Sequence, residues 1–205
     1  MAENNISIRY ENHSSDTVSD VLVFTKNTRA DLDALPPTAW QVISRVGYNG
    51  YHQFVYTIDT KIAVAWDGGN TGVMPSDTSE GTVWSLTTVG NDYELQQSGL
   101  ATLTNEIDVI NDVHVDNGIA VTLLKDGKPI MTQPLVAYGE KAEFGLMPKI
   151  YVGLVSNIIE GETLKSAVMS KDFTMFDLTG LKSFTFGLFG DLKGGYFFRA
   201  ISEET

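Results

Sequence analysis

The chain has 205 residues, no cysteine and a formal net charge of −12 at pH 7. The missing thiols exclude disulfides and thiolate metal sites, and the negative charge argues against nucleic acid as a partner. No apolar run approaches the roughly 18 residues of a membrane helix, and the first residues lack a signal-peptide pattern. We therefore expect a cytoplasmic protein that is not transmembrane, with release by a non-Sec route left open.

Short strands separated by turn residues fill the first half of the chain. The runs are apolar or alternate with period two, which is typical of strands in sandwiches and barrels. Strands are predicted at 6–10, 21–25, 40–46, 51–58, 62–66, 82–89 and 93–97. A single helical turn is predicted at 28–38, because Pro36 and Pro37 cannot continue a helix. A long loop is predicted at 67–81.

The second half follows a similar plan. Asp126-Gly127 is a turn pair that takes positive φ, and it predicts a hairpin between strands at 119–124 and 129–136. Further strands are predicted at 142–146, 149–155, 184–189 and 194–201. The segment 156–171 is predicted to be a short helix or an irregular strand.

Two parts of the chain resemble each other in their apolar and turn positions. Residues 40–65 align with 130–154, which places Val46 on Tyr138, Phe54 on Phe144 and Lys61 on Lys149. The match extends to 6–24 with 107–124 and to 82–87 with 174–179. Such positions are what two copies of one β unit need to share. Chance similarity is the alternative, since alternating valines align easily.

We therefore predict an all-β fold, namely an antiparallel, jelly-roll-like β-sandwich built from two duplicated units with a pseudo-twofold relation. The first sandwich repeat is predicted at 1–98 and the second at 99–205. The short junction between them is neither Pro-rich nor charged, so we expect the repeats to pack closely. Whether they form one sandwich or two stays open. The core is expected to hold Phe24, Trp40, Phe54, Trp66, Trp84, Phe144, Phe176, Phe184 and Phe186.

The strand at 194–201 is in excess of the predicted repeat. It contains Tyr196, Phe197, Phe198 and Arg199. We expect this strand to cover a sheet edge, either of its own molecule or of a neighbour.

One short string suggests catalysis. Glu106-Ile-Asp-Val-Ile-Asn111 resembles the EIDxxE strand of laminarinase-type glycoside hydrolases. The resemblance implies a β-jelly-roll hydrolase with Glu106 as nucleophile and Asp108 as helper. The acid/base position of that motif holds Asn111 here, which cannot donate a proton at neutral pH. An ordinary half-buried strand would also place Glu106 and Asp108 on one face, and we expect no catalytic residue.

No metal or cofactor site is expected. His13, His52 and His114 share no ligand spacing such as HxH or HxxxH. Two loops offer oxygen atoms without the calcium-loop pattern, so we interpret them as turns. These loops contain Asp67 and Asn70, and Asp112, Asp116 and Asn117.

The loop best suited to bind a ligand contains Tyr48, Asn49, Tyr51 and His52 around a glycine. Aromatic and amide side chains on such a loop can stack on a sugar ring or hydrogen-bond a lipid headgroup. Packing of these aromatic side chains on their own hairpin is the alternative.

These observations predict a non-enzymatic, soluble structural protein that acts through self-association, as a homo-oligomer or filament. The alternative is a carbohydrate- or lipid-binding module, such as a lectin or toxin component. A glycoside hydrolase is the remote alternative. The expected partner is therefore a second copy of the chain, with a glycan or lipid headgroup as the other candidate.

Overall fold

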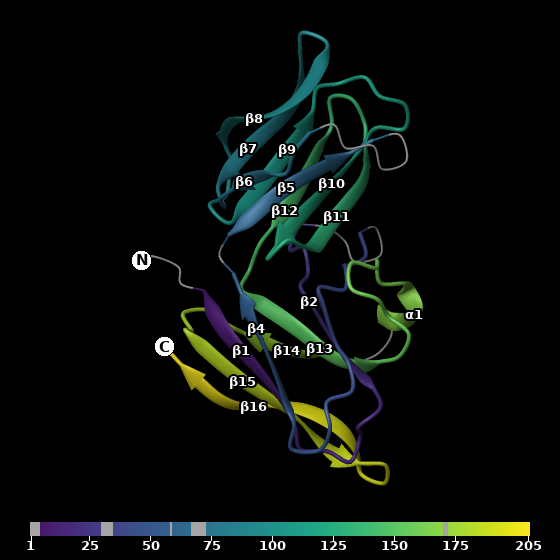
Figure 1. The fold of residues 1–205 in the computed structure, drawn as a ribbon. Helices are drawn as coiled ribbons and strands as arrows, with labels where there is room; N and C mark the ends of the chain where they lie inside the picture. Colours follow the sequence, from purple (N-terminus) through teal and green to yellow (C-terminus); the bar gives the residue numbers. More distant parts are fainter. Residues whose placement is uncertain (1–4, 30–34, 58, 67–72, 170–171) are drawn as a thin grey trace. The chain divides into compact units, whose positions relative to one another are not determined.

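The structure is a computed structural model that describes residues 5–29, 35–57, 59–66, 73–169 and 172–205 (Figure 1). Within these residues the chain forms sixteen strands and one four-residue helix, α1 (Ser166–Met169). The predicted all-β class is confirmed, and α1 lies in the segment for which a short helix was one prediction. That helix, the only one in the described part, is too short to cross a membrane. The predicted helical turn at 28–38 and loop at 67–81 fall partly outside the described residues.

The strands group into two compact units. Unit 1 comprises Met1–Lys26, Thr38–Ile58 and Pro148–Thr205, and unit 2 comprises Asn27–Pro37 and Asp59–Met147. Both units therefore combine strands from either side of the predicted boundary at residues 98 and 99. Neither 1–98 nor 99–205 is a compact unit by itself. That these two ranges are repeats of each other in sequence is a separate prediction.

Unit 1 consists of two four-stranded sheets with the orders β16-β15-β1-β4 and β14-β13-β2-β3 (Figure 1). Its strands are β1 (Ile6–Asn12), β2 (Asp20–Phe24), β3 (Gln41–Ile43), β4 (Tyr51–Tyr56), β13 (Lys149–Val155), β14 (Thr174–Asp177), β15 (Ser183–Asp191) and β16 (Gly195–Glu204). Neighbours are antiparallel except β1 and β15, which are parallel. The ring of Phe176 lies 5.1 Å from that of Phe184 in the other sheet, so the pair of sheets is sandwich-like.

Unit 2 also consists of two four-stranded sheets, with the orders β12-β9-β7-β8 and β11-β10-β5-β6. Its strands are β5 (Thr60–Ala65), β6 (Ser76–Thr78), β7 (Thr82–Val89), β8 (Asp92–Leu100), β9 (Glu106–Asn111), β10 (Ile119–Lys125), β11 (Lys128–Val136) and β12 (Lys141–Gly145). Here β7 and β9 form the parallel pair. The hairpin predicted at Asp126-Gly127 joins β10 to β11, and both residues have positive φ, 52° and 70°.

The two units have the same strand order and the same strand directions. In one sheet β4-β1-β15-β16 matches β12-β9-β7-β8, and in the other β3-β2-β13-β14 matches β11-β10-β5-β6. The parallel pair occupies the same place in both units. The block β1–β4 therefore corresponds to β9–β12, and the block β13–β16 corresponds to β5–β8.

A buried asparagine at the end of a strand makes equivalent side-chain hydrogen bonds in each unit. In unit 1, Asn12 Nδ2 donates to Val46 O at 2.7 Å, and Oδ1 accepts from the N–H two residues further on at 2.9 Å. In unit 2, Asn111 Nδ2 donates to Val136 O at 2.9 Å, and Oδ1 accepts from the N–H two residues further on at 3.1 Å. Each asparagine thus fastens the strand end to the connection between two other strands.

The main chain around these two asparagines matches as well. Asn12 N–H donates to Gly50 O at 3.0 Å, and Asn12 O accepts from the residue before that glycine at 2.7 Å. Asn111 N–H donates to Glu140 O at 3.0 Å, and Asn111 O accepts from the residue before that glutamate at 2.7 Å. The residue that donates has positive φ in both units, 59° and 77°. We call this arrangement the asparagine corner.

Strand order and the asparagine corner correct the internal alignment. Val46 is equivalent to Val136 rather than to Tyr138, a shift of two residues. The segment at 82–87 lies in β7, whose place in unit 1 is taken by β15 and not by the strand at 174–177. β16 takes the place of β8, so it is not in excess of the shared pattern. Alternating apolar residues recur in many of the strands, so the sequence match was displaced by two residues at Val46 and by one strand at 82–87.

The predicted aromatic core is largely confirmed. Fully or nearly buried members are Phe24, Trp40, Trp66, Phe144, Phe184 and Phe186. The other three, Phe54, Trp84 and Phe176, are half-buried. Full burial of a large aromatic side chain removes roughly 150–250 Å² from water, so the six buried rings contribute strongly to the apolar burial between the sheets.

Candidate functional site on one sheet of unit 1

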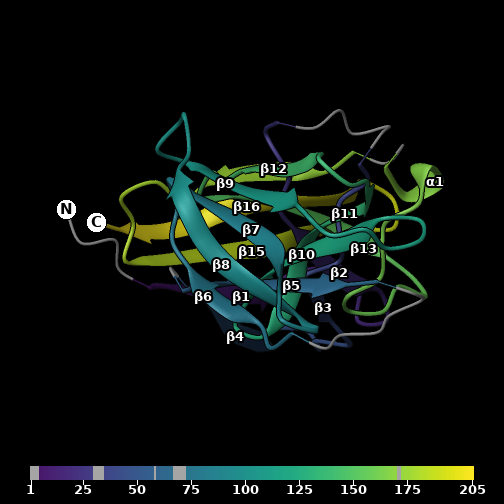
Figure 2. The ribbon, with the colours of Figure 1, turned by 90° about the horizontal axis from the view of Figure 1, so that it is seen from above.

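The outer face of the sheet β16-β15-β1-β4 carries a connected group of exposed and half-buried aromatic and charged side chains. The four strands lie side by side in both views (Figure 1 and Figure 2). Along β1, Ile6, Ile8 and Tyr10 are buried, whereas the alternate residues are not. Because side chains alternate across a strand, the alternate residues of β1 and their partners in register form this outer face.

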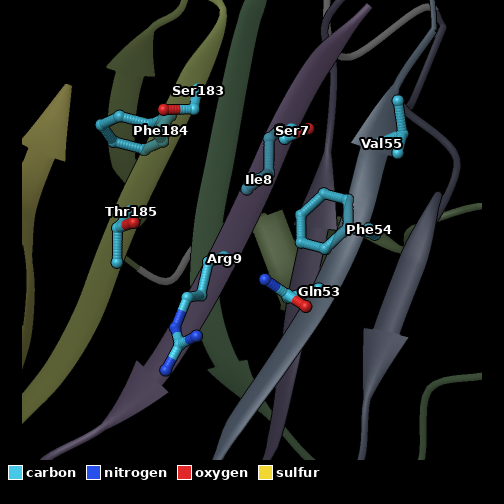
Figure 3. Close-up of a pocket in the computed structure, with 9 residues that line it drawn as sticks. All are labelled: Ser7, Ile8, Arg9, Gln53, Phe54, Val55, Ser183, Phe184 and Thr185. Atoms are coloured by element: carbon cyan, nitrogen blue, oxygen red, sulfur yellow. The ribbon is translucent and has the colours of Figure 1, made fainter. Parts of the chain in front are cut away.

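A shallow hollow of about 430 Å³ lies at one end of the outer face (Figure 3). Ser7 and Ser183 are paired in register across the parallel strands, as are Arg9 and Thr185. The hollow forms because these neighbouring strands place small hydroxyl side chains between larger ones. Gln53 of β4 and the guanidinium group of Arg9 add an amide and a positive charge to its lining.

A row of stacked and ion-paired side chains continues from the hollow. The guanidinium carbon of Arg9 lies 3.8 Å from the centre of the Tyr51 ring. Arg9 Nε donates to Glu11 Oε1 at 2.7 Å, and His13 Nε2 lies 2.9 Å from Glu11 Oε2. The hydrogen bond from His13, together with the one from Arg9, holds the pKa of Glu11 below its usual value although partial burial acts in the opposite direction. Glu11 therefore ties the arginine to the histidine.

The row then reaches β15 and β16. The His13 ring stacks on Phe189, with 5.1 Å between ring centres. On the same phenylalanine, Arg199 lies 4.0 Å from the ring centre and Phe197 stacks at 5.9 Å. Tyr51, Arg9, Glu11, His13, Phe189, Arg199 and Phe197 thus form one connected series, which we call the stacked row.

The predicted assembly strand 194–201 coincides with most of β16, and its four named residues divide between the two faces of the sheet. Phe197 and Arg199 belong to the stacked row on the outer face. Phe198 points inward, where its ring lies 6.4 Å from Tyr10 and 6.2 Å from Phe186. The Tyr196 hydroxyl is 3.1 Å from Ser15 Oγ. β16 is the end strand of its sheet, and its far edge pairs with no other described strand.

The predicted binding tip at residues 48–52 does not gather on one surface. Tyr51 lies on the outer face, where it stacks on Arg9. His52 is the next residue of β4 and so points to the other face, with its ring 6.3 Å from Phe54. Tyr48 and Asn49 form the turn of the asparagine corner, and Tyr48 is 67% exposed. Of the four residues, only Tyr51 joins the stacked row.

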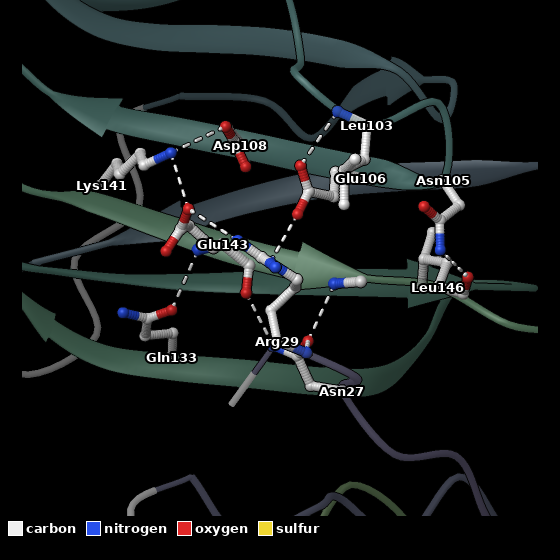
Figure 4. Close-up of polar contacts among 11 residues, drawn as sticks. Asn27, Arg29, Leu103, Asn105, Glu106, Asp108, Gln133, Lys141, Glu143 and Leu146 are labelled. Atoms are coloured by element: carbon white, nitrogen blue, oxygen red, sulfur yellow. Dashed lines mark hydrogen bonds and ion pairs between the residues drawn. The ribbon is translucent and has the colours of Figure 1, made fainter. Parts of the chain in front are cut away.

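The laminarinase-like string lies on β9 in unit 2, where its carboxylates are buried beneath cations (Figure 4). Glu106 is 2% exposed, and its Oε1 lies 2.5 Å from Arg29 Nε. Asp108 is 4% exposed, and its Oδ2 accepts from Lys141 Nζ at 3.2 Å. Lys141 also pairs with Glu143 at 2.6 Å, and these contacts raise the pKa of Lys141, the Glu143 hydrogen bond contributing most. The two carboxylates of the string are therefore held in internal ion pairs.

Asn111, which occupies the acid/base position of that resemblance, lies in the asparagine corner. It is fully buried, and its amide bonds main-chain groups. Alternation along β9 places its side chain on the face opposite to Glu106 and Asp108. The three residues of the string therefore do not converge on a common space.

The remaining sequence candidates lie apart. His13 stacks on Phe189 in unit 1, and His114 stacks on Tyr138 in unit 2 at 3.7 Å. Within the described ranges, no three His, Cys, Asp or Glu side chains are grouped so that they could hold a metal ion. The loop that contains Asp67 and Asn70 lies outside the described residues.

Sequence reasoning missed most of the stacked row, namely Arg9, Glu11, His13 and Phe189. The alternation in β1 does predict that Arg9 and Glu11 share a face, because they are two residues apart. Their contact with β15 depends on the parallel pairing of β1 and β15, which no local pattern predicts.

Comparison with known proteins gives no guide to function: no protein-family profile, no curated protein and no solved structure matches this chain.

Proposed function

We propose that this chain is a non-enzymatic β-sandwich protein that acts through self-association, and that the free edge of β16 is the contact between copies. The observation that carries the proposal is the length and position of this strand. β16 has ten residues and ends its sheet, so one row of main-chain N–H and C=O groups has no strand partner among the described residues. Such an edge is a template for pairing with another chain.

The other edge strands are less suited to this role. β4 has six residues, β12 five, β14 four, and β3 and β6 three each, which leaves fewer main-chain groups to pair than the ten residues of β16. β11 has nine residues but contains two prolines and shifts its register against β10 twice. β8 also has nine residues, but it presents Asp92 and Glu94 on one face, and edge charges of one sign oppose pairing.

β16 combines its free edge with exposed apolar surface. Phe197 is 53% exposed and Ile201 is 43% exposed. Neighbouring Gly187 leaves the space that the Ile201 side chain needs, because a Cβ there would lie 2.8 Å from both Ile201 and Phe189. Covering this surface in a second sheet would add hydrophobic stabilisation to the main-chain hydrogen bonds.

A non-enzymatic role is supported by the polar cluster of unit 2. Glu106 and Asp108 are buried under Arg29 and Lys141, so an incoming substrate would have to displace two ion pairs to reach them. A general acid or base must lie within hydrogen-bond reach of the group it serves.

We also propose that the chain arose by internal duplication, with β1–β8 and β9–β16 as the two copies. The shared strand order and the asparagine corner support it. Under this proposal each unit pairs the first block of one copy with the second block of the other. That the sandwich is jelly-roll-like is part of the same proposal.

The test of self-association places a charge on the β16 edge. Phe197→Lys should convert an oligomer into a monomer, because it replaces an exposed aromatic ring with a solvated cation beside Arg199. Leu100→Lys is the matched control, since Leu100 is 81% exposed at the end of edge strand β8 and should leave the mass unchanged. Light scattering after size exclusion measures both variants. A native chain that is monomeric, or equal masses for the native and Phe197→Lys proteins, would refute the proposal.

Carbohydrate binding is the second candidate, and the hollow on the outer face favours it. Serine and threonine hydroxyls, the Gln53 amide and the Arg9 guanidinium surround a space of about 430 Å³ beside the exposed ring of Tyr51. Sugars are bound by polar groups of this kind together with an aromatic ring.

This candidate predicts retention on a glycan array that is lost in Tyr51→Ala. Tyr138→Ala is the control, because Tyr138 is equally exposed (56% against 57%) but belongs to unit 2, whereas Tyr51 stacks on Arg9, which lines the hollow. Liposomes tested in parallel identify a lipid headgroup as the ligand instead. If the native protein binds neither glycans nor liposomes, or if Tyr51→Ala and Tyr138→Ala behave alike, the hollow is not a binding site of this kind.

A further inference from the structure

The geometry points to a particular pairing between copies: β16 lies antiparallel to β16 of a second copy about a twofold axis at Phe198, so that Arg199 of each copy lies opposite Phe197 of the other. This inference rests on the proposed self-association and adds its direction, its register and its chemistry. The product is one continuous eight-stranded sheet, four strands from each copy.

Charge decides the direction of pairing. β16 carries Arg199 near its middle and Glu203 and Glu204 at its end. Parallel pairing in register would place each of these charged residues opposite the same residue of the second chain, and like charges directly opposite each other are destabilising. Antiparallel pairing separates the two acidic ends and brings each toward Lys193 of the other copy, in the turn before β16.

The register is limited by an irregularity in β16. Phe186 pairs with Ala200 and Thr185 pairs with Ser202, so Ile201 is an extra residue that bulges from the strand. A bulge interrupts the ladder and bends the strand. The regular part of β16 available for pairing is therefore the segment 195–200.

Two registers, with the twofold axis at residue 197 or at residue 198, keep the outer face continuous over most of this segment. An axis at residue 199 places Arg199 opposite Arg199, which is repulsive. An axis at residue 197 leaves Arg199 opposite Gly195, without a side-chain partner. An axis at Phe198 places both arginines opposite the Phe197 rings, and it pairs as many residues as the axis at 197.

The Arg199 side chain is available for such a contact. Its guanidinium group already lies 4.0 Å from the centre of the Phe189 ring, and within the described ranges it forms no ion pair. In the proposed register its other side meets Phe197 of the second copy, so each arginine lies between two aromatic rings. Cations over aromatic faces are attracted by the ring quadrupole, and arginine stacks on such faces better than lysine does.

Complementary single variants test the register. In the proposed pairing Phe197→Lys places a lysine opposite Arg199, and Arg199→Glu places a glutamate opposite Phe197. Each variant alone should therefore have half the mass of the native dimer. Both substituted side chains are exposed, and circular dichroism of each variant verifies that it is folded.

Mixing the two variants should recover the native dimer mass. In the mixed pair the lysine introduced by Phe197→Lys on one chain lies opposite the glutamate introduced by Arg199→Glu on the other. A native arginine–phenylalanine contact remains beside this new ion pair, because each chain keeps the residue that the other has lost.

The outcomes separate this inference from the proposed function. A native monomer refutes self-association altogether. If the native protein is a dimer and the Arg199→Glu variant is still a dimer, the proposed register is wrong. In that case the axis at residue 197 fits better, because it places residue 199 opposite Gly195, where a glutamate would be tolerated. A native dimer whose two variants are monomeric but do not recover dimer mass on mixing also overturns the register, while self-association through β16 stands.

Discussion

Asn12→Ala and Asn111→Ala should each lower the free energy of unfolding by about 2–4 kcal/mol, measured by denaturant titration. Both asparagines are buried, at 1% and 0% exposure, and each bonds a main-chain carbonyl and a main-chain N–H. Alanine removes the amide and leaves these groups without partners. A buried polar group without a partner costs about 1–3 kcal/mol. Two such groups are left at Asn111, and at Asn12 the Asp16 carbonyl and the Ser14 hydroxyl also lose a hydrogen bond.

The comparison of these two variants tests the equivalence of the units. Asn91→Ala is the control, because Asn91 is exposed in the turn between β7 and β8 and should change stability by less than about 0.5 kcal/mol. Each corner variant should act mainly on its own unit, so the protein can show two transitions rather than one. A large effect of Asn111→Ala together with a negligible effect of Asn12→Ala would contradict an equivalent role for the two corners.

Arg29→Met should lower the free energy of unfolding by about 1–3 kcal/mol. Removing one partner of a buried ion pair leaves the other charge buried and uncompensated, which typically costs about 3–5 kcal/mol. The lower figure applies because the Arg29 side chain is 43% exposed and water screens part of the interaction, although Glu106 is almost fully buried. The remaining bond to Glu106, from Leu103 N at 3.2 Å, does not supply a positive charge.

A double-mutant cycle isolates this interaction. Adding Glu106→Gln to Arg29→Met should recover part of the lost stability, because the neutral amide no longer needs a counter-ion. Lys61→Met is the control, since Lys61 pairs with Asp77 on the surface of the same unit and should cost less than about 1 kcal/mol. If the double variant is less stable than the sum of the single variants predicts, the ion pair does not hold this cluster together.

The local features of the fold could be predicted from the sequence. Alternation at 6–10 predicted a strand, which the structure extends to Asn12, and Asp126-Gly127 predicted a hairpin because only a few residues tolerate two successive positive φ values. These features depend on neighbours within a few residues. The same local information predicted a strand at 194–201, most of which lies in the edge strand β16, whereas a role of this strand in assembly is still a proposal.

The pairing of distant strands could not be predicted in this way. Ser7 lies in register with Ser183, and nothing in either segment specifies the other. The short connections at 57–59 and 146–148 also do not reveal that the chain passes from one unit to the other at these points. As a result β5 and β13 each belong to a different unit from the strand that precedes them. For the same reason the row from Arg9 through His13 to Phe189 could not be found, because it depends on the parallel pairing of β1 with β15.

The most direct measurement is the mass of the native chain in solution over a range of concentrations, by sedimentation equilibrium. Self-association through β16 predicts a mass that rises with concentration toward twice 22.4 kDa, the value for two copies paired edge to edge. A mass of one chain at every concentration, up to the millimolar range, would contradict it.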